Sequence, residues 1–285
     1  MKVLASKSIE LQTAISTNSF YFSGCYTQNN LGRKSLNRIK AEFSNDAMIQ
    51  WLQLQNGIDA IPPNFQKTMW VTFENRRPPS RGFQRSLSFD IDTYSNSNFY
   101  LPLWLTYIDL FATKSPWVRH RVTQEDLLKK RQYKMKNRQF ACAFLNNPNP
   151  MRLRAIDELQ KIGEVTLYGR YSNNYVADKI SVSQKYKFSL CFENDLYPGY
   201  VTEKPLEAWL GGTVPLYWGD DAARCFNPSA LVNLKEFQSM QDFSEYVALL
   251  NSDESAFKKI YEQPLLSQIF ETERLTEFFS DWILE

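Results

Sequence analysis

The densest group of reactive side chains lies in residues 192–204, Phe-Glu-Asn-Asp-Leu-Tyr-Pro-Gly-Tyr-Val-Thr-Glu-Lys. An apolar run ends there, the Pro-Gly pair predicts a turn, and Thr202 is placed to cap a helix that opens with Glu203 and Lys204. A helix N-terminus beside a lysine favours the binding of a phosphate group. The same spacing also fits a capped helix that binds no ligand.

A second cation stands at the start of another predicted helix. The loop Asn147–Pro150 leads into Arg152, at a position where the helix macrodipole favours acidic residues. An arginine there is easier to explain if an anion binds, and together with Lys204 it could hold a diphosphate without a metal ion. The alternative is an ordinary ion pair between Arg152 and Asp157 or Glu158.

Carboxylates must supply most of the acid–base chemistry, because His120 is the one histidine of the chain and zinc sites or proton relays built on imidazole need more than one. Residues 68–73 are rich in aromatic and β-branched side chains and predict a buried strand. Glu74 follows this strand directly. Taken alone, it fits an exposed surface acid as well as a catalytic base.

After residue 138 the chain alternates between strand and helix patterns. The expected strands are 140–145, 164–168, 188–192 and 214–218, and the expected helices are 152–161 and 203–210. Such alternation predicts βαβ units and a parallel sheet. Ligands of these sheets bind at the carboxyl ends of the strands, so the loops after 145 and 192 should lie at the binding edge. Earlier in the chain we expect a strand at 2–5 and a helix at 45–55.

Composition excludes several other classes of protein. Among the 285 residues, 33 Lys and Arg nearly balance 31 Asp and Glu, and a net charge of +2 does not favour a nucleic acid as partner. The four cysteines form no Cys-x-x-Cys pair, which favours free thiols in a reducing compartment. The start of the chain lacks a signal-peptide pattern, and the longest apolar run, 99–112, is shorter than a membrane span. We therefore expect a cytoplasmic protein.

Nine lysines and arginines stand against two acids between 114 and 138. We interpret this segment as a basic linker between an N-terminal domain, 1–135, and a C-terminal domain, 136–285. Its charges fit a solvated linker, or contact with an anionic lipid surface or an acidic glycan.

Several motifs together resemble the bacterial α-1,3-fucosyltransferases. The motifs are 186–194, 200–204, 214–219 and 226–229, then 147–149 with Arg152, and finally 71–75, 88–90 and 100–103. The first group resembles the donor-binding domain of that family, the second its arginine segment, and the third the segment that bears the proposed catalytic base. The resemblance covers roughly residues 68 to 240.

The resemblance implies an α/β protein of the GT-B type, with two Rossmann-like domains facing across a cleft, the acceptor side first. It implies an inverting transfer of L-fucose from GDP-fucose to O3 of GlcNAc or glucose, with no cofactor and no metal. The residues that it assigns to GDP-fucose are Arg152, Asn194, Tyr200, Glu203 and Lys204. Glu74 would be the general base, and Glu203 would also stabilise cationic character at the anomeric carbon. The spacing to Arg152 is one residue shorter than in the family, so Arg154 is the alternative arginine.

Three alternatives stay open. The scaffold could use another nucleotide sugar, or it could bind a sugar or nucleotide without catalysis, although Glu74 beside an intact Glu203–Lys204 pair counts against a pure binding module. Asp90 and Asp92 form an Asp-x-Asp triplet, by which metal-dependent GT-A glycosyltransferases hold a divalent ion, but such triplets are common by chance.

The expected acceptor is a GlcNAc- or LacNAc-type or glucose-containing glycan, and the basic linker is the expected contact with a bacterial inner membrane.

Overall fold

The computed structural model describes residues 20–24, 67–72, 74–78, 83–112, 114, 118–133, 137–220 and 225–285. The chain divides into two compact units, one of Met1–Gln124 with Phe270–Glu285 and one of Glu125–Ile269. The elements expected at 2–5 and 45–55 lie outside the described residues.

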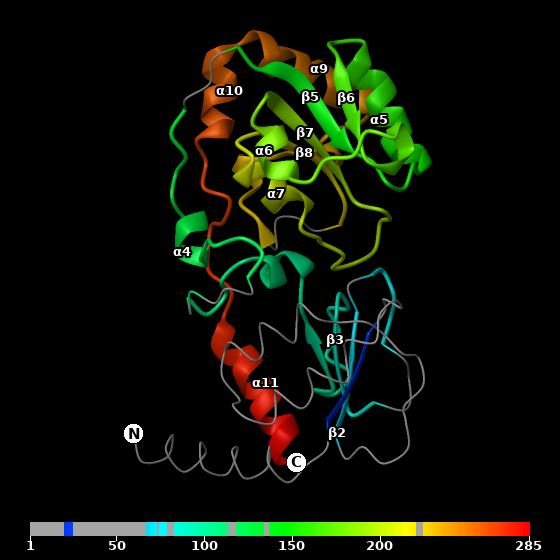
Figure 1. The fold of residues 1–285 in the computed structure, drawn as a ribbon, viewed down its shortest axis with the longest axis vertical. Coiled ribbons are helices and arrows are strands. Elements are labelled where there is room, and N and C mark those ends of the chain that lie inside the picture. Colours follow the sequence, from blue (N-terminus) through cyan, green and yellow to red (C-terminus); the bar gives the residue numbers. More distant parts are fainter. Residues whose placement is uncertain are drawn as a thin grey trace. The chain divides into compact units, whose positions relative to one another are not determined.

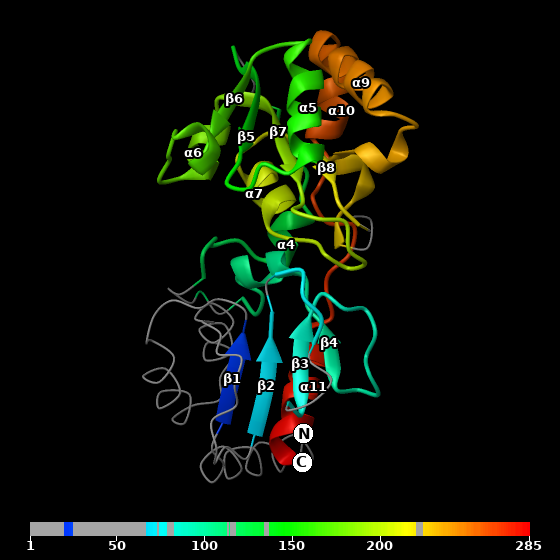
Figure 2. The ribbon, with the colours of Figure 1, turned by 90° about the vertical axis from the view of Figure 1, so that its right-hand side faces the viewer.

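A parallel sheet forms the core of the first unit (Figure 2). Its strands, in spatial order, are β1 (Phe20–Gly24), β2 (Lys67–Val71), β3 (Arg85–Ser88) and β4 (Asn98–Tyr100). The predicted strand 68–73 is thereby confirmed as β2, in which Met69 and Val71 are fully buried. A 3-10 turn, Leu103–Tyr107, follows β4.

The C-terminal helix α11 (Thr272–Leu284) packs on this first sheet. The ring of Phe278 contacts Phe99 of β4, with centroids 5.4 Å apart. The indole Nε1 of Trp282 donates to the Gln84 side chain over 3.2 Å. The last turn of the chain therefore closes the first unit.

The unit boundary differs from the predicted division into 1–135 and 136–285. It falls between Gln124 and Glu125, and residues 270–285 belong with the first unit. An amphipathic helix can pack on any sheet that has an uncovered apolar face, whatever its place in the sequence. Helix α11 packs on the first sheet, which is why the end of the chain belongs to the first unit.

The second unit is built on a second parallel sheet (Figure 1). Its strands are β5 (Gln139–Phe144), β6 (Val165–Tyr168), β7 (Tyr186–Phe192), β8 (Val214–Trp218) and β9 (Val232–Asn233). Their spatial order is β6-β5-β7-β8-β9, and each neighbouring pair runs parallel. The four strands predicted for this region are confirmed to within two residues at each end.

Helices cover both faces of the second sheet, which explains why its strands are almost continuously apolar. The helices of this half are α4 (Gln124–Leu127), α5 (Pro150–Gln160), α6 (Lys179–Ser183), α7 (Lys204–Leu210), α9 (Met240–Ser252) and α10 (Glu254–Tyr261), with 3-10 turns at Arg170–Ser172, Pro228–Ala230 and Leu234–Glu236. Apolar side chains of α5, α9 and α10 join one core with the strands, and α6 and α7 lie on the other face (Figure 2). None of the helices in the described part of the chain has the length and apolar character that a membrane crossing requires.

Two cations of the basic linker serve the packing of the second unit. Arg131 Nη1 donates to the carbonyls of Trp209 and Thr213 over 2.7 and 3.1 Å, and its guanidinium lies 4.1 Å from the ring centroid of Tyr261. Burial lowers the pKa of Arg131 to about 10. Arg138 donates to the first carbonyl of β7. These two charges hold the linker against the second unit, and membrane contact by the remaining cations stays a prediction.

Candidate functional site

The strand order of the second unit contains a topological switch point. The chain leaves β5 through α5 to reach β6 on one side, and later leaves β7 through α7 to reach β8 on the other side. The loops that follow β5 and β7 therefore start side by side, at the ends of neighbouring strands, and lead to opposite sides of the sheet. This is the position where open parallel sheets bind their ligands, and the loops predicted for the binding edge are the ones that meet there.

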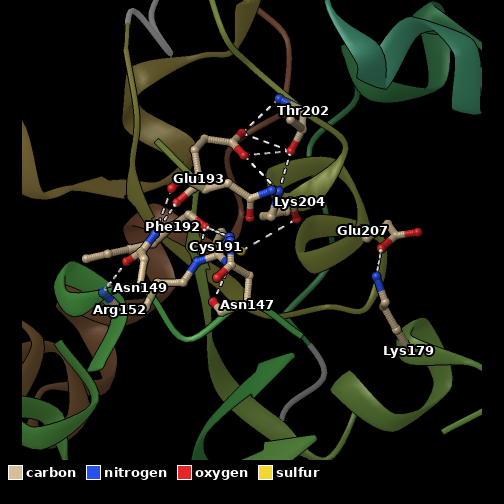
Figure 3. Close-up of polar contacts among 11 residues, drawn as sticks. Asn147, Asn149, Arg152, Lys179, Cys191, Phe192, Glu193, Thr202, Lys204 and Glu207 are labelled. Carbon is tan, nitrogen blue, oxygen red and sulfur yellow. Dashed lines mark hydrogen bonds and ion pairs between the residues drawn. The ribbon is translucent and has the colours of Figure 1, made fainter. Parts of the chain in front are cut away.

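Arg152 bridges these two loops (Figure 3). Asn149 caps α5 by accepting from the backbone N–H of Arg152 over 2.9 Å. The guanidinium donates from Nε and Nη2 to the carbonyl of Phe192 over 3.0 and 2.5 Å, and from Nη1 to the carbonyl of Asn147 over 3.0 Å. Three of its five N–H groups are therefore used on backbone carbonyls.

The surroundings of Arg152 distinguish it from the alternatives. The residue is 5% exposed, whereas Arg154 on the same helix points to solvent. Burial lowers the pKa of Arg152, against the opposing charge of Glu193. The alternative, an ion pair with Asp157 or Glu158, is not formed, because the guanidinium is directed to the carbonyls of Phe192 and Asn147. Glu158 pairs with Lys161 instead, over 2.7 Å. Arg152 is thus the arginine that α5 turns toward the switch point.

A buried carboxylate organises the start of α7 (Figure 3). Glu193, directly after β7, is fully buried. Its carboxylate accepts from the backbone N–H of Thr202 over 2.8 Å and from the Thr202 hydroxyl over 2.8 and 3.0 Å. Lys204 Nζ donates to the same carboxylate over 2.8 Å and to the Thr202 hydroxyl over 2.9 Å.

Thr202 is not the helix cap that its spacing predicts. The residue before α7 is Glu203, whose side chain makes no capping hydrogen bond, and the hydroxyl of Thr202 is turned instead to Glu193 and Lys204. As an N-cap the hydroxyl would accept from a backbone N–H of the first helical turn. Here it accepts from the Lys204 ammonium instead and donates to the Glu193 carboxylate, and both of these hydrogen bonds are charge-assisted. The predicted helix end is confirmed, with Gly211 as its C-cap.

The Lys204 ammonium stays charged in this setting. Burial alone would lower its pKa, but the carboxylates of Glu193 and Glu203 outweigh burial and hold the pKa of Lys204 well above its usual range. The side chain is still 23% exposed. It is therefore a cation that the fold fixes in place and leaves open to an anionic ligand.

The other residues predicted to bind the donor lie on the same edge. Tyr200 is 2% exposed, and Glu203 and Asn194 are half-buried. The carbonyl of Asn194 accepts from the Asn149 side chain over 2.8 Å, which ties the loop after β7 to the loop after β5. The structure thus brings the five predicted donor-site residues together at one sheet edge.

Glu74 belongs to the first unit. It lies beyond the carboxyl end of β2, as the sequence predicts, and is half-buried in a bend. The hydroxyl of Thr72, a residue 1% exposed, accepts from the backbone N–H of Glu74 over 3.2 Å and donates to its carbonyl over 3.0 Å. This clamp fixes the backbone from which the Glu74 side chain projects.

The two carboxylates of the Asp-x-Asp triplet interact with residues close to them in the sequence. Asp90 is 5% exposed, lies 3.3 Å from Arg77 and accepts from the Tyr94 hydroxyl. Asp92 accepts from the backbone N–H of Tyr94 over 2.8 Å. Within the described ranges no group of three His, Cys, Asp or Glu side chains is placed to hold a metal ion.

Comparison with known proteins decides the family. Residues 133–273 match the model of glycosyltransferase family 10 (fucosyltransferase), C-terminal part. These residues form a family-10 fucosyltransferase domain. The matched range contains the switch point and the five residues predicted to bind the donor.

Related proteins span more of the chain than the family model does. An alpha-(1,3)-fucosyltransferase of Helicobacter pylori is 30% identical over 229 residues, which cover 70% of this chain and 47% of that protein. A 4-galactosyl-N-acetylglucosaminide 3-alpha-L-fucosyltransferase 9 of Rattus norvegicus is 27% identical over 237 residues, covering 80% of this chain and 60% of the relative. The chain therefore spans about half to three fifths of the length of these curated relatives.

Solved structures share the fold. A crystal structure of alpha1,3-fucosyltransferase with GDP-fucose matches with a TM-score of 0.65 at 22% identity, covering 94% of this chain and 90% of the other. A crystal structure of alpha1,3-fucosyltransferase with GDP matches with a TM-score of 0.66 at 20% identity, covering 97% of each chain. The predicted fold class, α/β of the GT-B type, is confirmed.

Sequence reasoning missed the role of Glu193. The residue stands in the reactive segment, but an acid at a strand end carries no mark of burial. The available signal was charge: Lys204 opens a helix whose first turn sits against an apolar sheet, and a lysine in that position needs a carboxylate.

Proposed function

We propose that this chain transfers L-fucose from GDP-fucose to O3 of GlcNAc or glucose in a glycan, in α-1,3 linkage and with inversion at the anomeric carbon. The activities named for the Helicobacter pylori and Rattus norvegicus relatives support the reaction and a GlcNAc-type acceptor. A similar fold solved with GDP-fucose supports the donor.

One observation supports the proposed position of the donor site. The fold fixes the partly exposed Lys204 ammonium at the switch point of the family-10 domain. As GDP departs, negative charge grows on its β-phosphate, and a cation held in place beforehand stabilises that charge. Arg152 adds a second positive charge at the same edge, while its hydrogen bonds to Phe192 and Asn147 hold the loops together. Asn194, Tyr200 and Glu203 complete the proposed contacts.

Glu74 is the proposed general base. Its carboxylate takes the proton of the acceptor hydroxyl as that oxygen attacks the anomeric carbon from the face opposite GDP. The bond between the anomeric carbon and the phosphate oxygen breaks, and its electron pair leaves with GDP. No covalent intermediate is needed in this single displacement, and Glu203 could stabilise cationic character at the anomeric carbon. We propose that the reaction proceeds without a metal ion.

Transfer can be tested directly with labelled GDP-fucose and two acceptors, N-acetyllactosamine and lactose, with the linkage read by NMR. We expect an α-1,3-fucosylated product from the wild type. Glu74→Gln should bind GDP-fucose normally and lose about 10²- to 10⁴-fold in turnover, the usual contribution of a general base. Transfer from another nucleotide sugar, or wild-type turnover in Glu74→Gln, would contradict the donor or the base respectively.

A further inference from the structure

Glu193 is a buried charge to which the proposed reaction assigns no role. It is fully buried, and both of its carboxylate oxygens accept hydrogen bonds, Oε1 from the Thr202 backbone and hydroxyl and Oε2 from the Thr202 hydroxyl and Lys204 Nζ (Figure 3). Burying a carboxylate is expensive, and apolar residues of similar volume often replace a buried ion pair without loss of stability. Stability alone is therefore a weak explanation for this residue.

The end of β8 is also shaped to accommodate Glu193. The backbone N–H of Glu193 donates to the carbonyl of Trp218 over 2.7 Å. At Gly219, the next residue, a Cβ atom would lie 2.8 Å from Glu193 Cγ and 2.2 Å from the Tyr217 hydroxyl oxygen. Glycine at this position thus leaves the space that the glutamate side chain occupies.

The ammonium of Lys204 gains a fixed direction from this arrangement. Of its three N–H donors, Glu193 and Thr202 engage two, and the side chain remains 23% exposed. A lysine side chain is otherwise flexible, and ordering it on binding would oppose the binding of a ligand. Here the ordering is complete before any ligand arrives.

We propose that Glu193 is a positioning residue that holds the Lys204 ammonium in the orientation needed by the diphosphate of the nucleotide sugar. The inference rests on the proposed function and names a residue through which its donor site works. Glu193 acts through Lys204 and does not touch the nucleotide. Its negative charge also keeps Lys204 protonated, since it counters the effect of burial on the pKa of that lysine.

The test is calorimetric titration of GDP into the wild type, Glu193→Gln and Glu207→Gln, between neutral pH and about pH 9. Glu207 provides the matched control, because it is also a buried carboxylate that pairs with a lysine. It lies on α7, is 7% exposed and pairs with Lys179 over 3.2 Å, away from Glu193 and Lys204 (Figure 3). We expect Glu193→Gln to bind GDP about ten- to a hundredfold more weakly, the usual loss with a charged hydrogen-bond partner. Glu207→Gln should bind like the wild type.

The pH dependence separates positioning from a merely structural role. Without Glu193, the pKa of Lys204 falls, so the ratio of the Glu193→Gln and wild-type dissociation constants should rise with pH. Using the ratio cancels any titration of GDP itself. A Glu193→Gln variant with wild-type affinity would overturn the inference, and so would a weakened variant whose ratio does not change with pH, because that result would show a merely structural role. A wild type that binds neither GDP nor GDP-fucose would overturn the proposed function instead.

A second comparison does not depend on the stability of Glu193→Gln. In Glu193→Gln/Lys204→Met both charges are removed, so no buried ion is left unpaired. We expect this double variant to bind GDP as weakly as Lys204→Met alone, because Glu193 acts through the lysine. A further tenfold loss in the double variant would mean that Glu193 supports the site independently, and would overturn the inference.

Discussion

Replacement of Arg152 tests how the switch point is held together. Arg152→Met removes three hydrogen bonds, two to the carbonyl of Phe192 and one to the carbonyl of Asn147, which keeps its bond from the Asn149 backbone N–H. Each hydrogen bond to a charged group is worth about 1.5–3 kcal/mol. Because the three bonds end on only two carbonyls, we take about 4 kcal/mol, roughly the worth of two such bonds, as the expected loss.

Arg152→Lys distinguishes geometry from charge. A lysine keeps the positive charge, but its ammonium is a point donor that cannot reproduce the fork to Phe192 and the bond to Asn147 together. We expect it to recover less than half of the loss. If Arg152 served only as a charge for the diphosphate, lysine would recover most of the GDP affinity and the stability would hardly change.

Scanning calorimetry of the intact chain measures the stability of each variant. For a unit of this size, about 1 kcal/mol shifts the Tm by about 2–4 °C, so the transition of the second unit should fall by roughly 10 °C in Arg152→Met. Arg154→Met, on the exposed side of the same helix, should leave it unchanged. An Arg152→Met variant that melts with the wild type would refute the bridging role.

The remaining predictions concern the base and the metal. Thr72→Val removes the hydroxyl that clamps the Glu74 backbone and should lower kcat by about tenfold, about 1.4 kcal/mol, with little change in the KM for GDP-fucose, whereas Thr72→Ser should retain wild-type turnover. Equal effects of valine and serine in steady-state kinetics would contradict the clamp. Dialysis against EDTA should leave fucose transfer within about twofold of the untreated enzyme, and a loss that Mn²⁺ restores would contradict metal independence.

Much of the second unit can be predicted from the sequence, because each of its strands and helices has its own uninterrupted pattern of apolar residues that become buried. The strand 214–218 is apolar throughout, and such a strand needs cover on both faces, which the alternating helices provide. Arg152 is also predictable, since a cation in the first turn of a helix is unusual. Its main partner is not, because the carbonyl of Phe192 lies 40 residues away in the sequence and leaves no trace near Arg152.

The position of α11 and the role of Thr202 show where sequence reasoning stops. An amphipathic helix at 272–284 specifies that one face is buried, but not which sheet buries it. The spacing of Thr202 before a helix predicts a cap, and the cap is lost to Glu193, a residue nine positions upstream. Both outcomes depend on tertiary contacts, which sequence patterns do not encode.

The most direct measurement is calorimetric titration of GDP-fucose, GDP-mannose and UDP-galactose into the wild type and Lys204→Met, with EDTA present. A donor site at the switch point predicts that GDP-fucose binds most tightly and that Lys204→Met loses about ten- to a hundredfold in affinity. Undiminished binding of GDP-fucose by Lys204→Met would place the donor elsewhere. Binding of UDP-galactose alone, and only when metal is restored, would contradict both the donor and the metal-independent reaction.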